Sequence, residues 1–374
     1  MTARQRYLDT ILFRQPARIP LLPGGPREST LAAWHEQGLP TDVDLWAYLA
    51  ELVGVPVEAF HGPVAAPADF RMMPQFEERV LAHRDGHYMV QDWMGATTEI
   101  SDRFDYTYIR TAKDFVTRKW HAFPVTDRAS WAERMAWRYD ADDPARLPDD
   151  AEAWAALEGG DRPVTVRING PFWQMREWVG FEGLCVMMKD DPALVRDMAE
   201  AWRAVVLSLL ERVLRRVRVD IVHLSEDMAY KAHSMIAPAM ARRFLSPCYL
   251  AWGELLRSYG VPVYAMDSDG YIDDLIPVWL EAGINQADPM EVAAGNDLAV
   301  LRAQWGRRLA YVGGIDKRAI AAGGDALVDE FARVRPVLCD GGYLPSCDHG
   351  VPPDISWPNF VAYTRLLARE TGWG

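Results

Sequence analysis

Two strand-like runs, Ile221-Val-His-Leu224 and Val261-Pro-Val-Tyr-Ala265, enclose a predicted helix over residues 238–259, and this stretch decides the fold. Both runs are short, apolar and rich in β-branched or aromatic side chains, which is typical of strands buried on both faces. A helix of this length between two such strands predicts a parallel βα unit. The same unit recurs on both sides of this stretch.

Strands and helices alternate from about residue 145 to the end of the chain. Before the quoted stretch lie a helix at 150–157, the strand Pro163-Val-Thr-Val-Arg-Ile168, and helices at 181–189 and 192–217. After it come a helix at 272–281, a strand at Ile284-Asn285-Gln286, a helix at 297–305, a strand at Leu309-Ala-Tyr-Val312, a helix at 324–334, a strand at Tyr343-Leu344 and a helix at 357–370. One series without a linker predicts a single α/β domain over residues 1–374. Its expected form is a distorted (β/α)8 TIM barrel rather than an open doubly wound sheet.

The N-terminal third is less regular, and residues 23–145 are predicted to form a cap inserted into the barrel. A helix is expected at 3–14, and a first strand at Ile19-Pro-Leu-Leu22. Helices are also expected at 28–37 and 43–52. A hairpin-like pair of strands is expected within 86–110, with Gly95 at its turn.

Composition excludes several classes of function. The net charge of -13 is spread along the chain, so no basic stripe is available for nucleic acid. The four cysteines have no CxxC spacing, and the N-terminus has no apolar core of a signal peptide. No run approaches the length of a membrane span. These features predict a cytoplasmic protein without membrane contact.

Polar residues that follow the predicted strands are the candidate site, because these positions face the active site of a βα barrel. They are Arg167, Asn169, Trp173 and Arg176; His223, Glu226, Asp227 and Lys231; Asp267 and Asp269; Gln286 and Asp288; Asp316 and Lys317; and Cys347, Asp348 and His349. Their convergence on one rim predicts an enzyme.

The pair Asp267 and Asp269 has two interpretations. Two carboxylates this close could bind a cation, or one of them could hold a raised pKa and act as an acid. The alternative is an Asx turn completed by Gly270. With Cys347 the two carboxylates would form a mixed sulfur and oxygen site, and His349 could add nitrogen, a donor type that zinc favours.

Other candidates also have structural interpretations. Glu226 and Asp227 could cap the following helix, or they could orient or deprotonate a ligand. His223 lies inside an apolar strand, where a core histidine is the more frequent explanation. Lys231 and Lys317 fit structural ion pairs, although either could hold a ligand carboxylate.

Four segments resemble the uroporphyrinogen decarboxylase-like superfamily. They are Glu226-Asp-Met-Ala-Tyr-Lys231, Asp267-Ser-Asp-Gly270, Gly313-Gly-Ile-Asp-Lys-Arg318, and Gly341-Gly-Tyr-Leu-Pro-Ser with Asp348-His-Gly-Val-Pro-Pro-Asp354. Within that superfamily they are similar to the branch grouped with corrinoid-dependent methyltransferases. The resemblance runs from the first helix to the last. It implies a single distorted TIM barrel with its site at the C-terminal ends of the strands.

The resemblance also implies a metal site. That branch holds zinc with a His-x-Cys pair after one strand and a cysteine after the last. Asp267 and Asp269 stand in place of the pair, and Cys347 stands in place of the distant cysteine, so these three are the implied Zn²⁺ ligands. The arginine-rich stretch of true uroporphyrinogen decarboxylases is reduced to Arg27, which disfavours a porphyrinogen substrate.

The expected activity is therefore metal-assisted methyl transfer or demethylation between a small methylated compound, for example a methoxy-aromatic one, and a corrinoid carried by a separate small protein. Catalytic roles are predicted for Glu226, Asp227, Asp348 and His349. Substrate contacts are predicted for Arg167, Asn169, Trp173, Arg176, His223, Lys231, Gln286, Asp316 and Lys317. One alternative is cofactor-free decarboxylation of a small acid, and another is a non-catalytic corrinoid- or tetrapyrrole-binding protein. A homodimer is the expected assembly.

Overall fold

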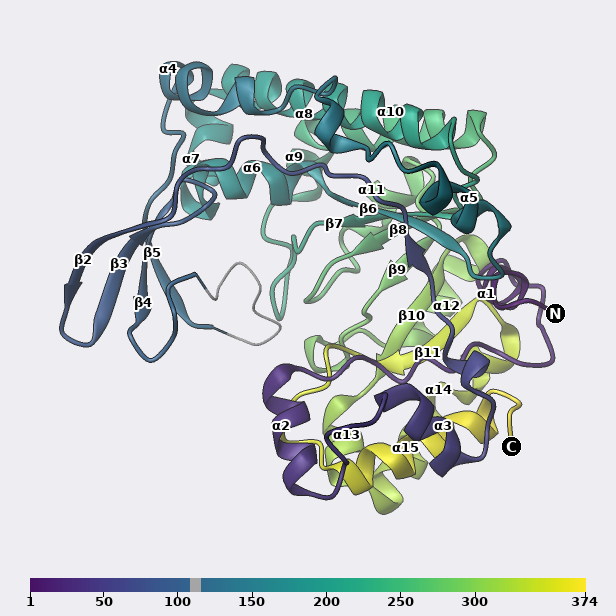
Figure 1. Cartoon of the computed structure of the whole chain (residues 1–374). Helices are drawn as coiled ribbons and strands as arrows, with labels where there is room; N and C mark the ends of the chain where they lie inside the picture. Colours follow the sequence, from purple (N-terminus) through teal and green to yellow (C-terminus); the bar gives the residue numbers. More distant parts are fainter. Residues whose placement is uncertain (108–115) are drawn as a thin grey trace.

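A computed structural model describes residues 1–107 and 116–374 of the chain. Seven parallel strands form one curled sheet, a half-barrel, in the order β1-β6-β7-β8-β9-β10-β11 (Figure 1). Their bounds are β1 Val64–Ala65, β6 Val164–Asn169, β7 Ile221–Ser225, β8 Val263–Asp267, β9 Gln286–Asp288, β10 Ala310–Ile315 and β11 Tyr343–Cys347. The prediction of an α/β domain built from successive parallel βα units is confirmed.

Helices cover the convex face of the sheet. They are α5 Ala151–Gly159, α6 Pro171–Val179, α7 Phe181–Asp190, α8 Pro192–Leu214, α9 Pro238–Phe244, α10 Ser246–Ser258, α11 Ile276–Glu281, α12 Leu298–Trp305, α13 Lys317–Ala322, α14 Gly324–Asp340 and α15 Trp357–Glu370. The single helix predicted at 238–259 is two helices, because Pro247 lacks the backbone N–H that a continuous helix needs. Helices α6 and α13 were not predicted.

The two edges of the half-barrel, β1 and β11, flank a segment without a ladder. The predicted first strand at 19–22 is wrong, because Pro20, Pro23 and Pro26 remove backbone donors from this segment. Isolated bonds remain: Leu21 N donates to Ala59 O at 2.9 Å, and Cys347 N donates to Pro23 O at 3.3 Å. Closure into a full eight-stranded barrel stays a prediction.

A four-stranded antiparallel sheet forms the centre of the predicted cap. Its strands are β2 Arg79–Arg84, β3 His87–Gln91, β4 Thr97–Ser101 and β5 Arg118–Ala122, in that order. The predicted hairpin is confirmed as β3 and β4, with Gly95 at a φ of 85° in the turn. Residues 108–110 of the predicted stretch lie outside the described ranges. Figure 1 shows this sheet projecting beyond the ends toward which the parallel strands run.

The predicted N-terminal helices are confirmed as α1 Ala3–Ile11, α2 Glu28–Glu36 and α3 Leu45–Val53. Helix α1 packs on the concave face of the sheet, where Tyr7 and Ile11 join a small core with Ile221 and Val263. These two partners are the first residues of β7 and β8, so α1 covers the N-terminal end of the half-barrel (Figure 1). The larger core lies between the convex face and the surrounding helices. No helix of the described residues is long and apolar enough to cross a membrane.

Candidate active site at the C-terminal ends of the strands

Strand register brings a set of polar side chains to the concave face. Side chains alternate along a strand, so His223 shares the face of Ile221, which packs on α1. His223 is in register with Arg167, and Asp267 is in register with Asp288. The concave face is therefore apolar beside α1 and becomes polar toward the C-terminal ends of the strands.

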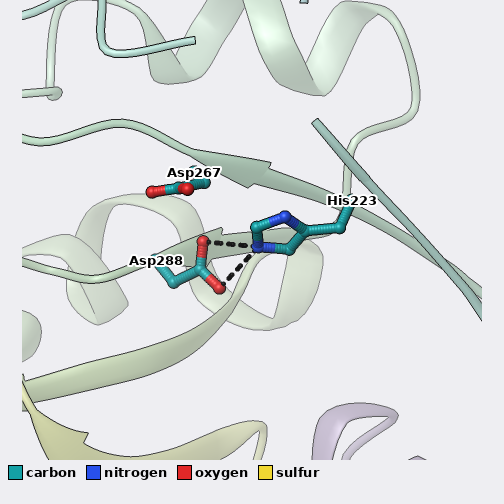
Figure 2. Close-up of side chains that lie close together, drawn as sticks. All are labelled: His223, Asp267 and Asp288. Atoms are coloured by element: carbon teal, nitrogen blue, oxygen red, sulfur yellow. Dashed lines mark hydrogen bonds and ion pairs between the residues drawn. The ribbon is translucent and has the colours of Figure 1, made fainter. Parts of the chain in front are cut away.

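His223 and Asp288 form the central contact of the site. The Nε2 atom of His223 lies 3.1 Å from Oδ1 and 3.0 Å from Oδ2 of Asp288, and Asp267 lies beside the pair (Figure 2). Burial opposes a charge on His223, but the neighbouring Asp288 outweighs it and raises the pKa of the imidazole. The Nδ1 atom is buried and has no hydrogen-bond partner among the described residues. His223 is thus paired with a carboxylate through Nε2, while its Nδ1 atom has no partner among the described residues.

Asp267 belongs to two clusters of potential ligands. One contains His223, Asp267 and Asp288, and the other contains Asp227, Asp267 and Asp269; within each, the ligand atoms lie within 4.8 Å of one another. Burial, and then the charge of Asp288, raise the pKa of Asp267 well above its usual range. Carboxylates this close repel one another unless a cation or protons neutralise them.

The two clusters suit different ions. One imidazole nitrogen and two carboxylates match the donor types of a catalytic Zn²⁺ site. The orphaned Nδ1 of His223 is a second sign that this cluster is incomplete by itself. The cluster of three carboxylates offers oxygen alone, which suits Mg²⁺, Ca²⁺ or Mn²⁺.

Cys347 is not brought to either cluster within the described part of the chain. Its partner in register is Ile315, and both residues belong to the large core on the convex face. Strand β11 continues to Cys347, so the alternation of side chains turns the thiol away from the concave face. Burial raises the pKa of this thiol to about 12, which disfavours the thiolate that a metal would need.

His349 and Asp269 form a second histidine–carboxylate pair on the rim. The Nε2 atom of His349 lies 3.1 Å from Oδ2 of Asp269, and its Nδ1 lies 3.3 Å from Nη2 of Arg27. A guanidinium only donates, which assigns Nδ1 as the acceptor and places the proton on Nε2. The hydrogen bond to Asp269 raises the pKa of His349. Asp227 holds Asp269 in turn, since Asp227 Oδ1 accepts from Asp269 N at 3.3 Å.

Glu226 is fully buried and binds the N-terminus of α6. Its Oε2 accepts from Trp173 N at 2.8 Å, and its Oε1 accepts from Tyr249 OH and, at 3.4 Å, from Phe172 N. A Cβ on Gly170 would lie 2.1 Å from the Glu226 Cδ, so the carboxylate fills the space that glycine leaves. Burial raises the pKa of Glu226 to about 7. Glu226 therefore caps the preceding helix α6, not the following one, and its predicted catalytic role stays a prediction.

Asp348, like Glu226, is a buried carboxylate that accepts hydrogen bonds from backbone N–H groups. It is fully buried, and its carboxylate accepts from Val292 N at 2.9 Å and from Lys317 N at 3.1 Å. These bonds tie the loop after β9 to the N-terminus of α13. Asp348 thus holds the loops that carry its neighbour His349, and a catalytic role for it stays untested.

The remaining predicted residues have various contacts. Gln286 accepts from Tyr7 OH at 3.3 Å, and Asp316 pairs with Arg318 at the start of α13. Lys317 pairs with Glu291 at 3.3 Å. Arg176 donates to the backbone oxygen of Asp227 at 3.0 Å and lies over the ring of Trp173. Lys231 is exposed and makes no hydrogen bond or ion pair in the described ranges.

A cavity of about 740 Å³ lies beside this site and gathers three predicted substrate residues, Arg167, Asn169 and Trp173. Arg118 and Glu177 also line it, and sequence reasoning missed both. Glu177 accepts from Trp173 Nε1 at 2.8 Å, and burial raises its pKa to about 7. The Gly170-Pro171 pair could have revealed α6 and with it Glu177, because proline is frequent at the first position of a helix.

Comparison with known proteins shows the fold alone. No family model matches the chain, and no curated protein matches it. Among solved structures, it is similar to a methyltransferase from Methanosarcina mazei, with a TM-score of 0.57 and 14% identity over 98% of each chain. A B12-independent methionine synthase from Shewanella sp. aligns with a TM-score of 0.35 and 12% identity, over 95% of this chain and 97% of that one, which is too low to carry an argument. The chain thus shares the overall fold of a methyltransferase.

Proposed function

We propose that the protein is a methyltransferase that moves a methyl group between a small methoxy-aromatic compound and a corrinoid on a separate small protein, assisted by a metal ion. The observation that carries the proposal is the His223–Asp288 pair with Asp267 at the open end of the half-barrel. The shared fold with a methyltransferase supports the reaction class. The corrinoid acceptor rests on the sequence resemblance.

Methyl transfer from an ether requires help for the leaving oxygen. The methyl carbon forms a bond to the electron pair of the acceptor, the C–O bond breaks, and its electrons stay on the aryl oxygen. A divalent cation, when bound, supplies Lewis-acid polarisation of that oxygen. His223, Asp267 and Asp288 would hold it, since their ligand atoms lie within 4.8 Å of one another.

The leaving oxygen also needs a proton, and His349 is the rim residue we assign to supply it. The proton comes from the imidazolium form, which Asp269 favours, and its transfer leaves the neutral ring with Nε2–H donating to Asp269 and Nδ1 accepting from Arg27. The role of Asp227 is to orient Asp269 through its backbone N–H. Asp267, Asp269 and Cys347 are the alternative set of Zn²⁺ ligands. This set is disfavoured because Cys347 belongs to the large core on the convex face of the sheet.

The test combines elemental analysis of the purified protein with a methyl-transfer assay. We expect one divalent metal per chain and methylation of cob(I)alamin by methoxy-aromatic compounds, followed by the visible spectrum of the corrinoid. Asp267→Asn, which alters both clusters, should lower turnover by about a hundredfold or more. The matched control Asp329→Asn changes an exposed residue of α14 and should retain activity. Undiminished activity in a metal-free protein would contradict the metal-assisted mechanism.

One observation favours a second candidate, cofactor-free decarboxylation of a small acid. Arg167 is exposed on the concave face, and its side chain makes no hydrogen bond or ion pair with a described residue, so it could hold a substrate carboxylate. In that reaction the C–C bond breaks, CO₂ leaves, and Asp267 protonates the carbon that keeps the electron pair. Release of CO₂ from aromatic acids without any corrinoid would identify this activity. Arg176 and Lys317, two other predicted substrate contacts, are engaged with Asp227 and Glu291.

A further inference from the structure

The cavity of about 740 Å³ beside the acidic cluster is lined by residues that differ in charge from that cluster. It lies between residues 66–75, the antiparallel sheet, β6 and α6. Asn169 at its inner end is in register with Ser225, and Ser225 is in register with Asp267. One strand therefore separates the cavity from the proposed reaction site, and a ligand in it could present one end to that site.

The cavity has an excess of positive charge on an acidic protein. Four arginines line it against two carboxylates, Asp69 and Glu177, whereas the chain as a whole carries a net charge of -13. Arg71 pairs with Asp69, and Arg146 donates to four backbone carbonyl groups that it holds together. Arg118 has only a long ion pair with Asp92, at 3.8 Å, and the side chain of Arg167 has no ion pair among the described residues, so both could serve a ligand and the cavity favours an anion.

Arg118 has a buried guanidinium nitrogen that lacks a hydrogen-bond partner among the described residues. Its guanidinium is half-buried over the ring of Trp120, with 4.1 Å between Cζ and the ring centroid. The Nη1 atom is buried and has no hydrogen-bond partner within residues 1–107 and 116–374, and Asp92 Oδ2 stays 3.8 Å away. A buried donor without a partner costs free energy that a ligand acceptor would recover. A carboxylate suits this position, because guanidinium and carboxylate groups match in geometry.

The rest of the cavity suits a flat ring. Trp93 and Trp173 both line it, and aromatic walls favour aromatic ligands through stacking. Asn169, Gln174 and Glu177 add polar groups at the α6 side. The volume is in the range of sites for small organic molecules. Arg167, in register with His223, lies at the end nearest the reaction site.

We infer that this cavity binds an aromatic carboxylate, with the acid group on Arg118, the ring at Trp93 and Trp173, and the opposite substituent directed past Asn169 toward Asp267. The inference rests on the proposed function, for which it names the methyl donor as a methoxybenzoate-type acid. Arg167, which lines the cavity in register with His223, would stabilise the negative charge that develops on the aryl oxygen as the methyl group leaves.

Equilibrium binding tests the inference on the full chain as isolated, without corrinoid or added metal. Calorimetric titration compares 4-methoxybenzoate, its neutral amide and phenyl phosphate. We expect the acid to bind about tenfold more tightly than the amide, since a charge-assisted hydrogen bond is lost in the amide. Equal affinity of acid and amide, or no binding of the acid at millimolar concentration, would overturn the inference. Tighter binding of phenyl phosphate would overturn the choice of a carboxylate.

Variants of Arg118 test whether this residue binds the acid group of the ligand. Arg118→Gln should abolish the preference for the acid over the amide, and Arg118→Lys should restore part of it. Arg84→Gln makes the same charge change on exposed β2 of the same sheet and should keep the preference. Circular dichroism checks that each variant is folded, and the Lys variant provides the test if the Gln variant does not fold. A preference that survives Arg118→Gln in folded protein would refute the assignment.

Failure of the cavity assignment and failure of the proposed function give different experimental results. Tight binding of 4-methoxybenzoate without methylation of cob(I)alamin would keep the cavity assignment and refute the proposed function. Methyl transfer from neutral aryl ethers, with no binding of the acid, would keep the function and refute the cavity assignment.

Discussion

Replacing Glu226 by alanine should destabilise the protein strongly, because the carboxylate is fully buried and serves several donors. Trp173 N donates to it at 2.8 Å, and Tyr249 OH donates to the other oxygen. Each buried donor left without an acceptor costs about 1–3 kcal/mol, so two of them cost about 2–6 kcal/mol. A value of about 4 kcal/mol is a large part of the stability of an ordinary domain.

The expected shift in melting temperature follows from chain length. Unfolding entropy is about 2.1 cal/mol/K per residue, which gives about 0.8 kcal/mol/K for 374 residues. A loss of about 4 kcal/mol then lowers Tm by about 5 °C in differential scanning calorimetry. Glu226→Gln keeps an acceptor for Trp173 N and a donor toward Tyr249, so it should lose less than half of that. The control Glu254→Ala removes an exposed carboxylate of α10 and should stay within about 1 °C.

A local measurement distinguishes loss of the cap from a general effect. The backbone amides of Phe172 and Trp173 should exchange hydrogen faster in Glu226→Ala than in Glu254→Ala, because they lose their acceptor. A melting temperature within about 1 °C of the unchanged protein, or unchanged exchange at these amides, would refute the capping argument. If Glu226→Gln melts normally but has lost turnover, the carboxylate has a catalytic role after all.

Three further predictions concern the same region. Gly170→Ala should cost about 3 kcal/mol in calorimetry, because its Cβ would meet Glu226 Cδ at 2.1 Å, and an unchanged Tm would contradict this contact. The pKa of Glu177 is about 7 in the folded protein but about 4.5 in the unfolded chain, so the unfolded chain loses this proton at a lower pH than the folded protein does. The free energy of unfolding should therefore fall by about 3 kcal/mol between about pH 4.5 and 7 in urea titrations, and Glu177→Gln should remove that part; equal slopes in both proteins would refute it. His223→Ala should weaken Zn²⁺ binding by about tenfold or more in calorimetric titration while Cys347→Ala leaves it unchanged, and the reverse order would favour the sulfur-containing ligand set.

Much of the parallel sheet could be predicted, and the failure at its edge has a clear cause. The runs that became β7 and β8 are apolar apart from His223, which fits strands covered on both faces. The run at 19–22 is equally apolar, but Pro20 and its neighbours Pro23 and Pro26 deprive it of ladder donors. Counting backbone donors as well as hydrophobic side chains would have corrected this prediction.

The sequence predicted that the site residues lie at the C-terminal ends of the strands, but not which of them contact one another. His223 and Asp288 are 65 residues apart, and only the register across β7, β8 and β9 brings them together. An apolar strand around a histidine gives no sign of that partner. Cys347 was expected in a loop because the strand was predicted to end at 344; three more residues of strand turn its side chain to the other face.

The position of α1 under the half-barrel constrains the order of folding during synthesis. Tyr7 and Ile11 emerge from the ribosome well before their partners such as Val263 and Leu344. The helix must therefore wait, exposed or held elsewhere, until nearly the whole chain is available. Contacts between such distant residues form slowly and leave apolar surface exposed meanwhile. Cells that express this chain at a high rate should accumulate aggregated protein in which α1 has not docked on the sheet.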